Sequence, residues 1–505
     1  MLSKSLFIKG LQCQKALWLK MHKSDVLTPP SEQAKAIFET GQKVGNLAKE
    51  LFLNGKEVQY EGTTREQRAV QTKQWLDDGV QTIYEATFIH DDMQVMVDIL
   101  HKNGDSWEIY EVKSSTENDD PKKHPVKDVY LDDASAQYYV VSGAGLKVSK
   151  VHVTLINKRY VLGDEIDARE YFKSIDVTQE VLERQDIVRE RLKEFKRVVV
   201  GEDEYIKEIG YHCKHPYDCD AMEYCWKTLA KVPEFSIYDL LQMRENPTKT
   251  FATLHEQGII DVADIPDDFK LTDIQKLQVD AWKYKDTHTD KEAIAGFLNK
   301  ITYPVYHLDF ETCNAAVPMH KGTRPFQQVA FQYSLHIEHE DGTLEHKEFL
   351  AQADGIDPRR AFAQSLIENI PAGVCVTAYN ERFERNRIEE LRALQEEFRP
   401  TLDGILANVV DLMEPFSKKY YYHWSLKGRF SIKLIMPLLT PHMADAYKKL
   451  KLVKNGGDAM NTFPRLIDMD EADRQEHREA LLEYCKLDTL SMVEVHRALR
   501  KLAQS

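Results

Sequence analysis

TIYEATFIHDDMQVMVDILHKNGDSWEIYEVKSS, residues 82–115, decides the fold of the first half of the chain. Apolar and polar side chains alternate along three runs, 82–90, 93–102 and 106–115, which the turn-forming residues DD and NGD separate. Such alternation is typical of half-buried β-strands. Helix-like patterns lie on both sides of these runs, at about 32–53, 132–143 and 178–197. The stretch therefore predicts an α/β unit built around three consecutive strands.

A second α/β unit is expected from Tyr303 onward. Its expected elements are strands at 304–312, 327–337 and 374–379 and a closing helix at about 475–502. Residues 233–300 show short helix-like segments and no strand pattern. We therefore expect three parts, which are an N-terminal α/β domain at 1–232, a helical connector at 233–300 and a C-terminal α/β domain at 301–505.

The composition limits the classes of function. A net charge of −15 over 505 residues argues against a protein that coats nucleic acid over its whole surface, although a local basic track remains possible. No apolar run approaches the roughly 18 residues that span a bilayer, and charges run through the first twenty residues, unlike a signal peptide. We expect a cytoplasmic protein with no membrane partner. Its seven cysteines should be reduced there, so grouped cysteines indicate metal binding before disulfides.

The three N-terminal strands carry the first candidate site. Alternation places Asp98 on one strand face with apolar neighbours, and it places Glu111 and Lys113 together on the next strand. Charges on an apolar face are costly unless they are paired or bound to metal. Two carboxylates that hold Mg²⁺ or Mn²⁺, with a lysine beside them, suit phosphodiester hydrolysis, and Glu85 is a further candidate ligand. The alternative is an exposed sheet face with a simple Glu–Lys pair.

The order of these residues resembles a known superfamily. D-x12-E-V-K followed by Gln137 and Tyr138 is similar to the PD-(D/E)XK nucleases, in particular their RecB-like branch, over roughly residues 1–230. The resemblance implies a restriction-endonuclease-like α/β fold, metal ligation by Asp98 and Glu111, catalysis by Lys113 and support from Gln137. That branch often has a histidine on its early helix, and GQKVGNLAKELF has none.

A second candidate site combines the first C-terminal strand with the closing helix. Asp309 and Glu311 share one strand face, where like charges repel unless cations lie between them. Such a pair matches the demand of a two-metal site. Asp488 interrupts the apolar stripe of the closing helix, one turn after Tyr484, so it needs a partner. The alternative is that these acids are strand-end and helix-surface charges.

D-x-E on a strand followed by Y-x3-D on a closing helix resembles the DnaQ-like, DEDD-type 3'-to-5' exonucleases over about 301–505. The resemblance implies a ribonuclease-H-like α/β fold, metal binding by Asp309, Glu311 and Asp488, and a water-orienting Tyr484. The middle motif departs from the family pattern, because AYNERFERNRI has glutamate where those enzymes have aspartate. The residues assigned to that motif and to substrate contact are Asn380, Glu384, Ser431 and Lys433.

Four cysteines form a separate candidate centre. Cys213, Cys219 and Cys225 are spaced C-x5-C-x5-C, and Cys13 lies far upstream. Soft thiolates suit an iron–sulfur cluster or a structural zinc, and plain buried thiols are the third alternative. Some RecB-like nucleases resemble this arrangement, which implies a [4Fe-4S] cluster that clamps the domain. The looser spacing leaves Zn²⁺ open, with His212 or His215 as substitute ligands.

The two resemblances together are similar to a group of bacterial two-nuclease proteins. They imply a metal-dependent nuclease that acts on DNA ends or single strands in repair or defence. The alternatives are an RNA-trimming exoribonuclease and a nucleic-acid-binding scaffold with one decayed site. KKYYYHWSLKGRFSIK, residues 418–433, mixes cations with aromatic rings and is a candidate track for single strands, or else a loop with packed aromatics.

Overall fold

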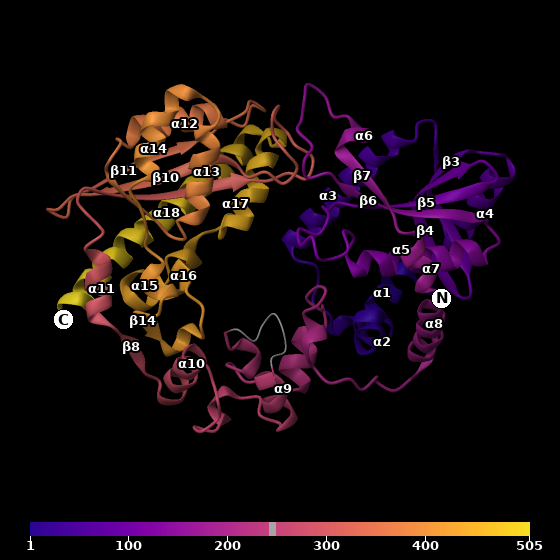
Figure 1. Cartoon of the computed structure of the whole chain (residues 1–505), viewed down its shortest axis with the longest axis horizontal. Helices are drawn as coiled ribbons and strands as arrows, with labels where there is room; N and C mark the ends of the chain where they lie inside the picture. Colours follow the sequence, from indigo (N-terminus) through magenta and orange to yellow (C-terminus); the bar gives the residue numbers. More distant parts are fainter. Residues whose placement is uncertain (242–248) are drawn as a thin grey trace. The chain divides into compact units, whose positions relative to one another are not determined.

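The chain forms two compact units in the computed structural model, which describes residues 1–241 and 249–505. Unit 1 comprises residues 1–231 and 315–327, and unit 2 comprises 232–314 and 328–505. Both units combine helices with a mixed sheet, which confirms the predicted α/β fold class (Figure 1). Within the described ranges, no helix is both long enough and apolar enough to cross a bilayer.

Unit 1 is built on a seven-stranded mixed sheet in the order β2-β3-β4-β5-β6-β7, with β1 paired to β4. The strands are β1 (Leu2–Ser3), β2 (Lys56–Glu57), β3 (Thr82–His90), β4 (Met93–Asn103), β5 (Ser106–Lys113), β6 (Val148–Ile156) and β7 (Phe172–Asp176). The helices are α1 (Lys4–Gln12), α2 (Gln14–His22), α3 (Glu32–Ala48), α4 (Arg65–Asp77), α5 (Asp128–Gly143), α6 (Ala168–Tyr171), α7 (Thr178–Glu183) and α8 (Gln185–Val200). The three strands predicted from 82–115 are confirmed as β3, β4 and β5.

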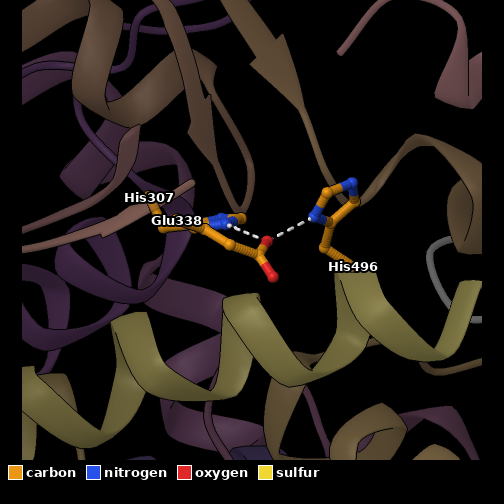
Figure 2. Close-up of side chains that lie close together, drawn as sticks. All are labelled: His307, Glu338 and His496. Carbon is orange, nitrogen blue, oxygen red and sulfur yellow. Dashed lines mark hydrogen bonds and ion pairs between the residues drawn. The ribbon is translucent and has the colours of Figure 1, made fainter. Parts of the chain in front are cut away.

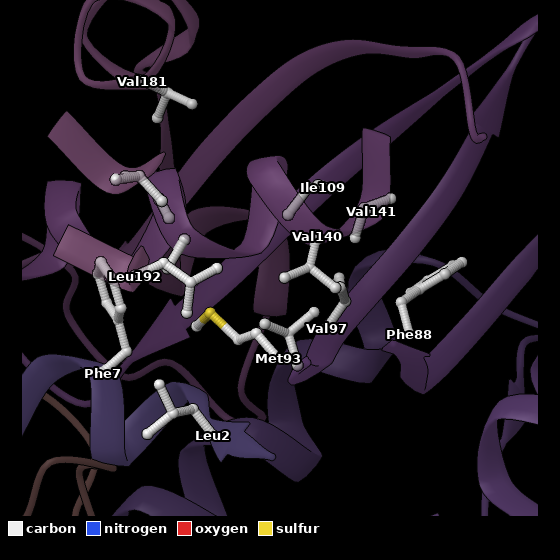
Figure 3. Close-up of a cluster of buried hydrophobic side chains, with 14 of the residues drawn as sticks. Leu2, Phe7, Phe88, Met93, Val97, Ile109, Val140, Val141, Val181 and Leu192 are labelled. Carbon is white, nitrogen blue, oxygen red and sulfur yellow. The ribbon is translucent and has the colours of Figure 1, made fainter. Parts of the chain in front are cut away.

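The main core of unit 1 lies between this sheet and helices α1, α5 and α8 (Figure 3). The alternation in β4 sends Met93 and Val97 into this core, where Leu192 of α8 also lies. Phe7 of α1 packs edge-on against Phe195 at 5.4 Å between ring centroids. Gly10 allows this approach, since a Cβ atom there would lie 2.8 Å from the Phe195 ring. The close contact positions α1, whose first residue reaches the candidate site.

Unit 2 contains a five-stranded sheet in the order β11-β10-β9-β12-β13. Its strands are β9 (Val305–Cys313), β10 (Val329–Glu338), β11 (Leu344–Leu350), β12 (Cys375–Ala378) and β13 (Val409–Asp411), and a separate pair is formed by β8 (Thr287–Thr289) and β14 (Tyr421–His423). Its helices are α9 (Lys249–Glu256), α10 (Asp273–Tyr284), α11 (Lys291–Leu298), α12 (Arg359–Asn369), α13 (Arg382–Arg392), α14 (Arg399–Leu406), α15 (Glu414–Ser417), α16 (Ile432–Leu439), α17 (Gly456–Thr462) and α18 (Glu471–Gln504).

The two faces of the unit 2 sheet differ in chemistry. One face carries Leu308 and Phe310 of β9 and packs on α12, α13 and α14 in an apolar core. The other face carries His307, Asp309 and Glu311, and α18 lies across it (Figure 1). Antiparallel pairing with β10 aligns Ser334 and other polar side chains beside these residues. Because side chains alternate between the two faces of a strand, the polar residues of β9 all lie on the face that α18 covers.

The structure differs from two sequence-based expectations. Residues 315–327, expected in the C-terminal domain, belong to unit 1, because Ala316 joins a unit 1 core and its carbonyl accepts a 2.9 Å hydrogen bond from the Tyr171 hydroxyl. The connector includes strand β8, which pairs with β14. The sequence did not predict this strand, because three residues are too few to show a periodic pattern. Residues 242–248 of the expected connector lie outside the described residues.

Candidate functional site

A group of buried acids lies between β9 and α18 in unit 2. Ligand atoms of Asp309, Glu311 and Cys485 lie within 4.8 Å of one another. Asp488 follows Cys485 by one helical turn, so it faces the same strand, and it is 7% exposed. The predicted pairing of an acidic strand with the closing helix is therefore present in the geometry.

Repulsion and burial dominate the electrostatics of this group. Burial and the negative charge of Asp488 raise the pKa of Asp309 well above its usual range. Burial and the charges of Asp309 and Asp488 do the same to the pKa of Glu311. Burial also raises the pKa of Asp488, against the opposing effects of Lys433 and the Tyr447 hydroxyl. Several crowded carboxylates beside a single lysine, Lys433, fit hard divalent cations such as Mg²⁺ or Mn²⁺.

Glu384 reaches this group from the first turn of α13. It is buried, and burial followed by the charge of Asp309 raises its pKa well above the usual range. Among the described residues, its Oε2 atom has no hydrogen-bond partner. A buried carboxylate oxygen without a partner is costly unless something binds it. Glu384, the glutamate of the middle motif, could therefore supply a fourth carboxylate to a bound metal ion.

Two tyrosines and a lysine surround Asp488. Lys433 Nζ donates to the Tyr484 hydroxyl at 3.1 Å, and the Tyr447 hydroxyl donates to Asp488 Oδ1 at 2.5 Å and lies 3.1 Å from Ser491 Oγ. Burial and the charge of Asp488 raise the pKa of both tyrosines, so both remain protonated phenols. Sequence reasoning missed Tyr447, because it lies in a single turn of 3-10 helix 41 residues before Asp488.

Cys485 is a further member of this group that the sequence did not single out. Its sulfur lies 3.7 Å from both the carbonyl oxygen and Oδ2 of Asp309. Burial and the charge of Asp309 raise the pKa of this thiol, so it stays protonated and acts as a hydrogen-bond donor to Asp309. Its position three residues before Asp488 was the available signal.

Other predicted substrate-contacting residues lie outside this acid group. Asn380 is exposed at the end of β12, where its backbone N–H donates to Asp411 Oδ1 at 3.0 Å in a left-handed conformation, φ 75°. Ser431 is exposed and precedes α16 as its N-cap. In the candidate aromatic track, Tyr421 and Tyr422 are buried in a core and so do not offer their ring faces to bases. The packed-aromatics alternative holds for these two rings.

The unit 1 site is a network of opposite charges. Lys113 Nζ contacts Glu111 Oε1 at 2.5 Å and also contacts Asp133 of α5. Lys4 Nζ, from the start of α1, lies 2.8 Å from the same Glu111 oxygen and 3.2 Å from Asp133. Gln137 donates to the other oxygen of Glu111. Strands β4 and β5 with α5 thus bring together the predicted residues Glu111, Lys113 and Gln137.

Lys4 and Asp133 were missed by sequence reasoning. Burial would lower the pKa of Lys113 and of Lys4, but the charges of Asp133 and Glu111 outweigh it and raise both. Burial and the charge of Asp98 oppose ionisation of Glu111, yet Lys113 and Lys4 bring its pKa below the usual value. Asp133 precedes Gln137 by one helical turn, a spacing that could have indicated it. Lys4 offered no comparable pattern.

Asp98 and Glu85 complete the unit 1 site. Asp98 Oδ2 accepts a hydrogen bond from the Val112 backbone N–H at 2.6 Å. Glu85 lies opposite Asp98, between the paired residues of β3 and β4, with a left-handed φ of 55° that is costly for a non-glycine residue. Burial raises the pKa of both carboxyls. Four acids against two ammonium groups leave an excess of negative charge that matches one divalent cation.

The four predicted cysteines line one small cavity in unit 1. Cys13 lies at the junction of α1 and α2, and the backbone N–H of Cys219 donates to the carbonyl of Cys213 at 2.8 Å. Burial raises the pKa of Cys219 and Cys225 to about 11. Sets of three His, Cys, Asp or Glu side chains with ligand atoms within 4.8 Å occur elsewhere in the described chain, but none is drawn from these cysteines. The four thiols therefore face one common cavity.

Comparison with known proteins places part of this chain near uncharacterised relatives. Residues 306–431 match the family described as "Domain of unknown function (DUF2779)". The chain is 24% identical over 233 residues to "Uncharacterized protein MG366 homolog" of Mycoplasma pneumoniae, covering 43% of this chain and 35% of that protein. It is 25% identical over 234 residues to "Uncharacterized protein UU173" of Ureaplasma parvum, covering 42% and 33%. The chain thus spans about a third of these relatives. No solved structure matches it.

Proposed function

We propose that the chain is a metal-dependent nuclease that hydrolyses DNA phosphodiester bonds, with a 3'-to-5' exonuclease site in unit 2 and a second site in unit 1. The observation that carries the proposal is the crowding of Asp309, Glu311, Glu384 and Asp488, whose pKa values are all raised by burial and, for the first three, by one another's charge. Such a group is unfavourable in the folded chain unless cations neutralise it. Repair or defence is the role we assign to it.

In unit 2, Asp309, Glu311 and Asp488 would hold Mg²⁺ or Mn²⁺, with Glu384 as a further oxygen donor. Bound there, the ions supply charge neutralisation and a more acidic water. Tyr484 orients the attacking water through its hydroxyl, and Lys433 holds that hydroxyl in place from 3.1 Å. Tyr447 and Ser491 fix the rotamer of Asp488 through their mutual hydrogen bonds.

In unit 1, Asp98 and Glu85 are the acids best placed to hold a metal, because Glu111 is already bonded to two ammonium groups and an amide. Lys113 lies between Glu111 and Asp133, where it stabilises negative charge on a bound phosphate. Gln137 orients Glu111 through the oxygen that the lysines leave open. The excess negative charge of the site supports one cation of Mg²⁺ or Mn²⁺ type.

The experiment is degradation of a 5'-labelled single-stranded DNA, and of RNA of the same sequence, with Mg²⁺, Mn²⁺ or EDTA. We expect a ladder that shortens from the 3' end only when metal is present. Asp309→Ala or Asp488→Ala should reduce this ladder more than about 100-fold, since even the outer partners of a metal site cost 10–100-fold. Lys113→Ala should leave the ladder intact and remove a distinct cleavage product.

Glu340→Ala is the matched control, because it removes an exposed acid from the same unit. If Lys113→Ala and Asp309→Ala eliminate the same ladder, or if neither alters any product, the two-site proposal is wrong. Activity that survives EDTA and dialysis excludes metal dependence. Faster degradation of RNA than of DNA would assign the exonuclease to RNA trimming instead.

We further propose that Cys13, Cys213, Cys219 and Cys225 hold a [4Fe-4S] cluster. The four thiols line one cavity, and four cysteine thiolates are the ligand set of such a cluster. Protein prepared without oxygen should contain about four iron and four sulfide per chain, and Cys13→Ser should lose them. Stoichiometric zinc without iron would decide for zinc.

A further inference from the structure

A second metal-ligating group lies on the polar face of the unit 2 sheet, apart from the acids described above. His307 of β9, Glu338 of β10 and His496 of α18 place one ligand atom each within 4.8 Å of the others. Figure 2 shows both imidazole rings directed at the carboxylate of Glu338 from opposite sides. The three side chains are 0%, 2% and 2% exposed. They come from three elements, so the fold brings them together.

One of the two nitrogen–oxygen distances is longer than a hydrogen bond and matches the spacing of two zinc ligands. His307 Nε2 lies 3.4 Å from Glu338 Oε2, which is beyond the usual 2.7–3.2 Å range of N–H···O bonds. Two ligands of a tetrahedral zinc with bonds of about 2.0–2.1 Å lie roughly 3.3 Å apart. His496 Nδ1 lies 2.9 Å from the same oxygen, so this edge would open by a few tenths of an ångström.

Surrounding contacts orient the group as they do around metal ligands. The other ring nitrogen of His307, Nδ1, lies 2.7 Å from Thr377 Oγ1. A partner on the second ring nitrogen is typical of metal-bound histidine. Arg497 Nε donates to Glu338 Oε1 at 2.6 Å and leaves Oε2 to the two imidazoles. One carboxylate oxygen and two imidazole nitrogens therefore converge on one point.

We propose that His307, Glu338 and His496 form a buried Zn²⁺ site. Nitrogen and carboxylate ligands suit zinc, and one water completes its four positions. The ion would link α18 to β9 and β10. Because all three ligands are buried, the ion would not contact a substrate. The inference does not depend on the proposed nuclease activity.

The test separates a metal site from a hydrogen-bonded network through two conservative variants. His307→Gln places an amide N–H near Nε2, and His496→Asn places one near Nδ1, so each variant keeps a donor to Glu338 and loses an imidazole ligand. His336→Asn is the matched control, because His336 is buried on the same face and its Nδ1 bonds to Thr489 Oγ1 at 2.8 Å.

Each chain is stripped with EDTA, incubated with ZnSO₄, freed of excess ions, and measured for zinc by mass spectrometry and for melting temperature. We expect the parent and His336→Asn to hold one zinc per chain more than either test variant, and zinc to raise their melting temperatures only. Comparing counts removes any zinc bound by the cysteines.

Equal zinc in the parent and both test variants overturns the proposal, as does no zinc in any of them. If one variant fails to fold by circular dichroism, the other decides. If both fail, the parent is loaded with Co²⁺. When the cysteine thiols have been alkylated beforehand, visible absorption of tetrahedral Co²⁺ supports nitrogen and oxygen ligands, and the lack of that absorption overturns the site.

Discussion

Asp309→Asn should stabilise unit 2 when metal is absent, although it removes a proposed catalytic acid. The carboxylates of Asp309 and Glu311 lie within 4.8 Å of each other. Two unit charges at that distance repel by about 3.5 kcal/mol at an effective dielectric constant of about 20. Because Asp309 is partly exposed, we expect a gain of about 2 kcal/mol in the free energy of unfolding.

The sign of the pH dependence follows from the raised pKa of Asp309. A carboxyl whose pKa is higher in the folded than in the unfolded chain contributes stability below its unfolded pKa of about 3.9. That stability is lost as the pH rises through the folded pKa, where the charge appears. The gain from Asp309→Asn should therefore be small near pH 5 and grow toward pH 8.

The assay is calorimetric melting in EDTA at pH 5 and pH 8, with and without Mg²⁺. A gain of about 2 kcal/mol corresponds to a rise of roughly 4–8 °C for a unit of this size. Mg²⁺ should raise the melting temperature of the parent more than that of the variant. Glu340→Gln, an exposed acid, should shift neither. A lower melting temperature for Asp309→Asn in EDTA at pH 8, or an equal gain at both pH values, would refute the reasoning.

Two further predictions concern one residue in each unit. Tyr484→Phe should slow 3'-end hydrolysis by about 10²-fold, because only the hydroxyl that positions water is lost, and isothermal titration should find Mg²⁺ or Mn²⁺ affinity unchanged. Weakened metal affinity would instead make Tyr484 a structural residue. Phe7→Ala should destabilise unit 1 by about 3–5 kcal/mol, since it empties a buried ring site against Phe195. Phe38→Ala, at a side chain that is 66% exposed, is its control, and equal effects in calorimetry would contradict this account.

Sequence reasoning located the acids because they break local patterns. Asp309 and Glu311 recur with the period of a strand, and Asp488 interrupts a helical stripe, so each stands out within a window of a few residues. The same logic located Asp98 and Glu111 on neighbouring strands. These patterns are short-range, and the strands and helices that carry them are present in the structure.

The residues that sequence reasoning missed act over long distances. Lys4 reaches Glu111 across 107 residues of chain, and Tyr447 reaches Asp488 across 41. Neither interrupts a periodic pattern, because one begins a helix and the other lies in a single turn of 3-10 helix. The sequence left the burial of Tyr422 undecided between a track for single strands and packed aromatics, and the ring is buried in a core. Such features depend on tertiary packing, which local composition does not encode.

Because residues 315–327 belong to unit 1, the two units cannot be separated by a single cut in the chain. The polypeptide passes from one unit to the other three times, at 231, 314 and 327. A fragment that stops at residue 231 would lack Ala316 from one of its own cores and would leave the Tyr171 hydroxyl without its carbonyl acceptor. The complementary fragment would carry, between β9 and β10, a loop that has lost its packing partners. Neither half is a self-sufficient module, so insertions, deletions or gene splits between the halves must preserve this exchanged segment.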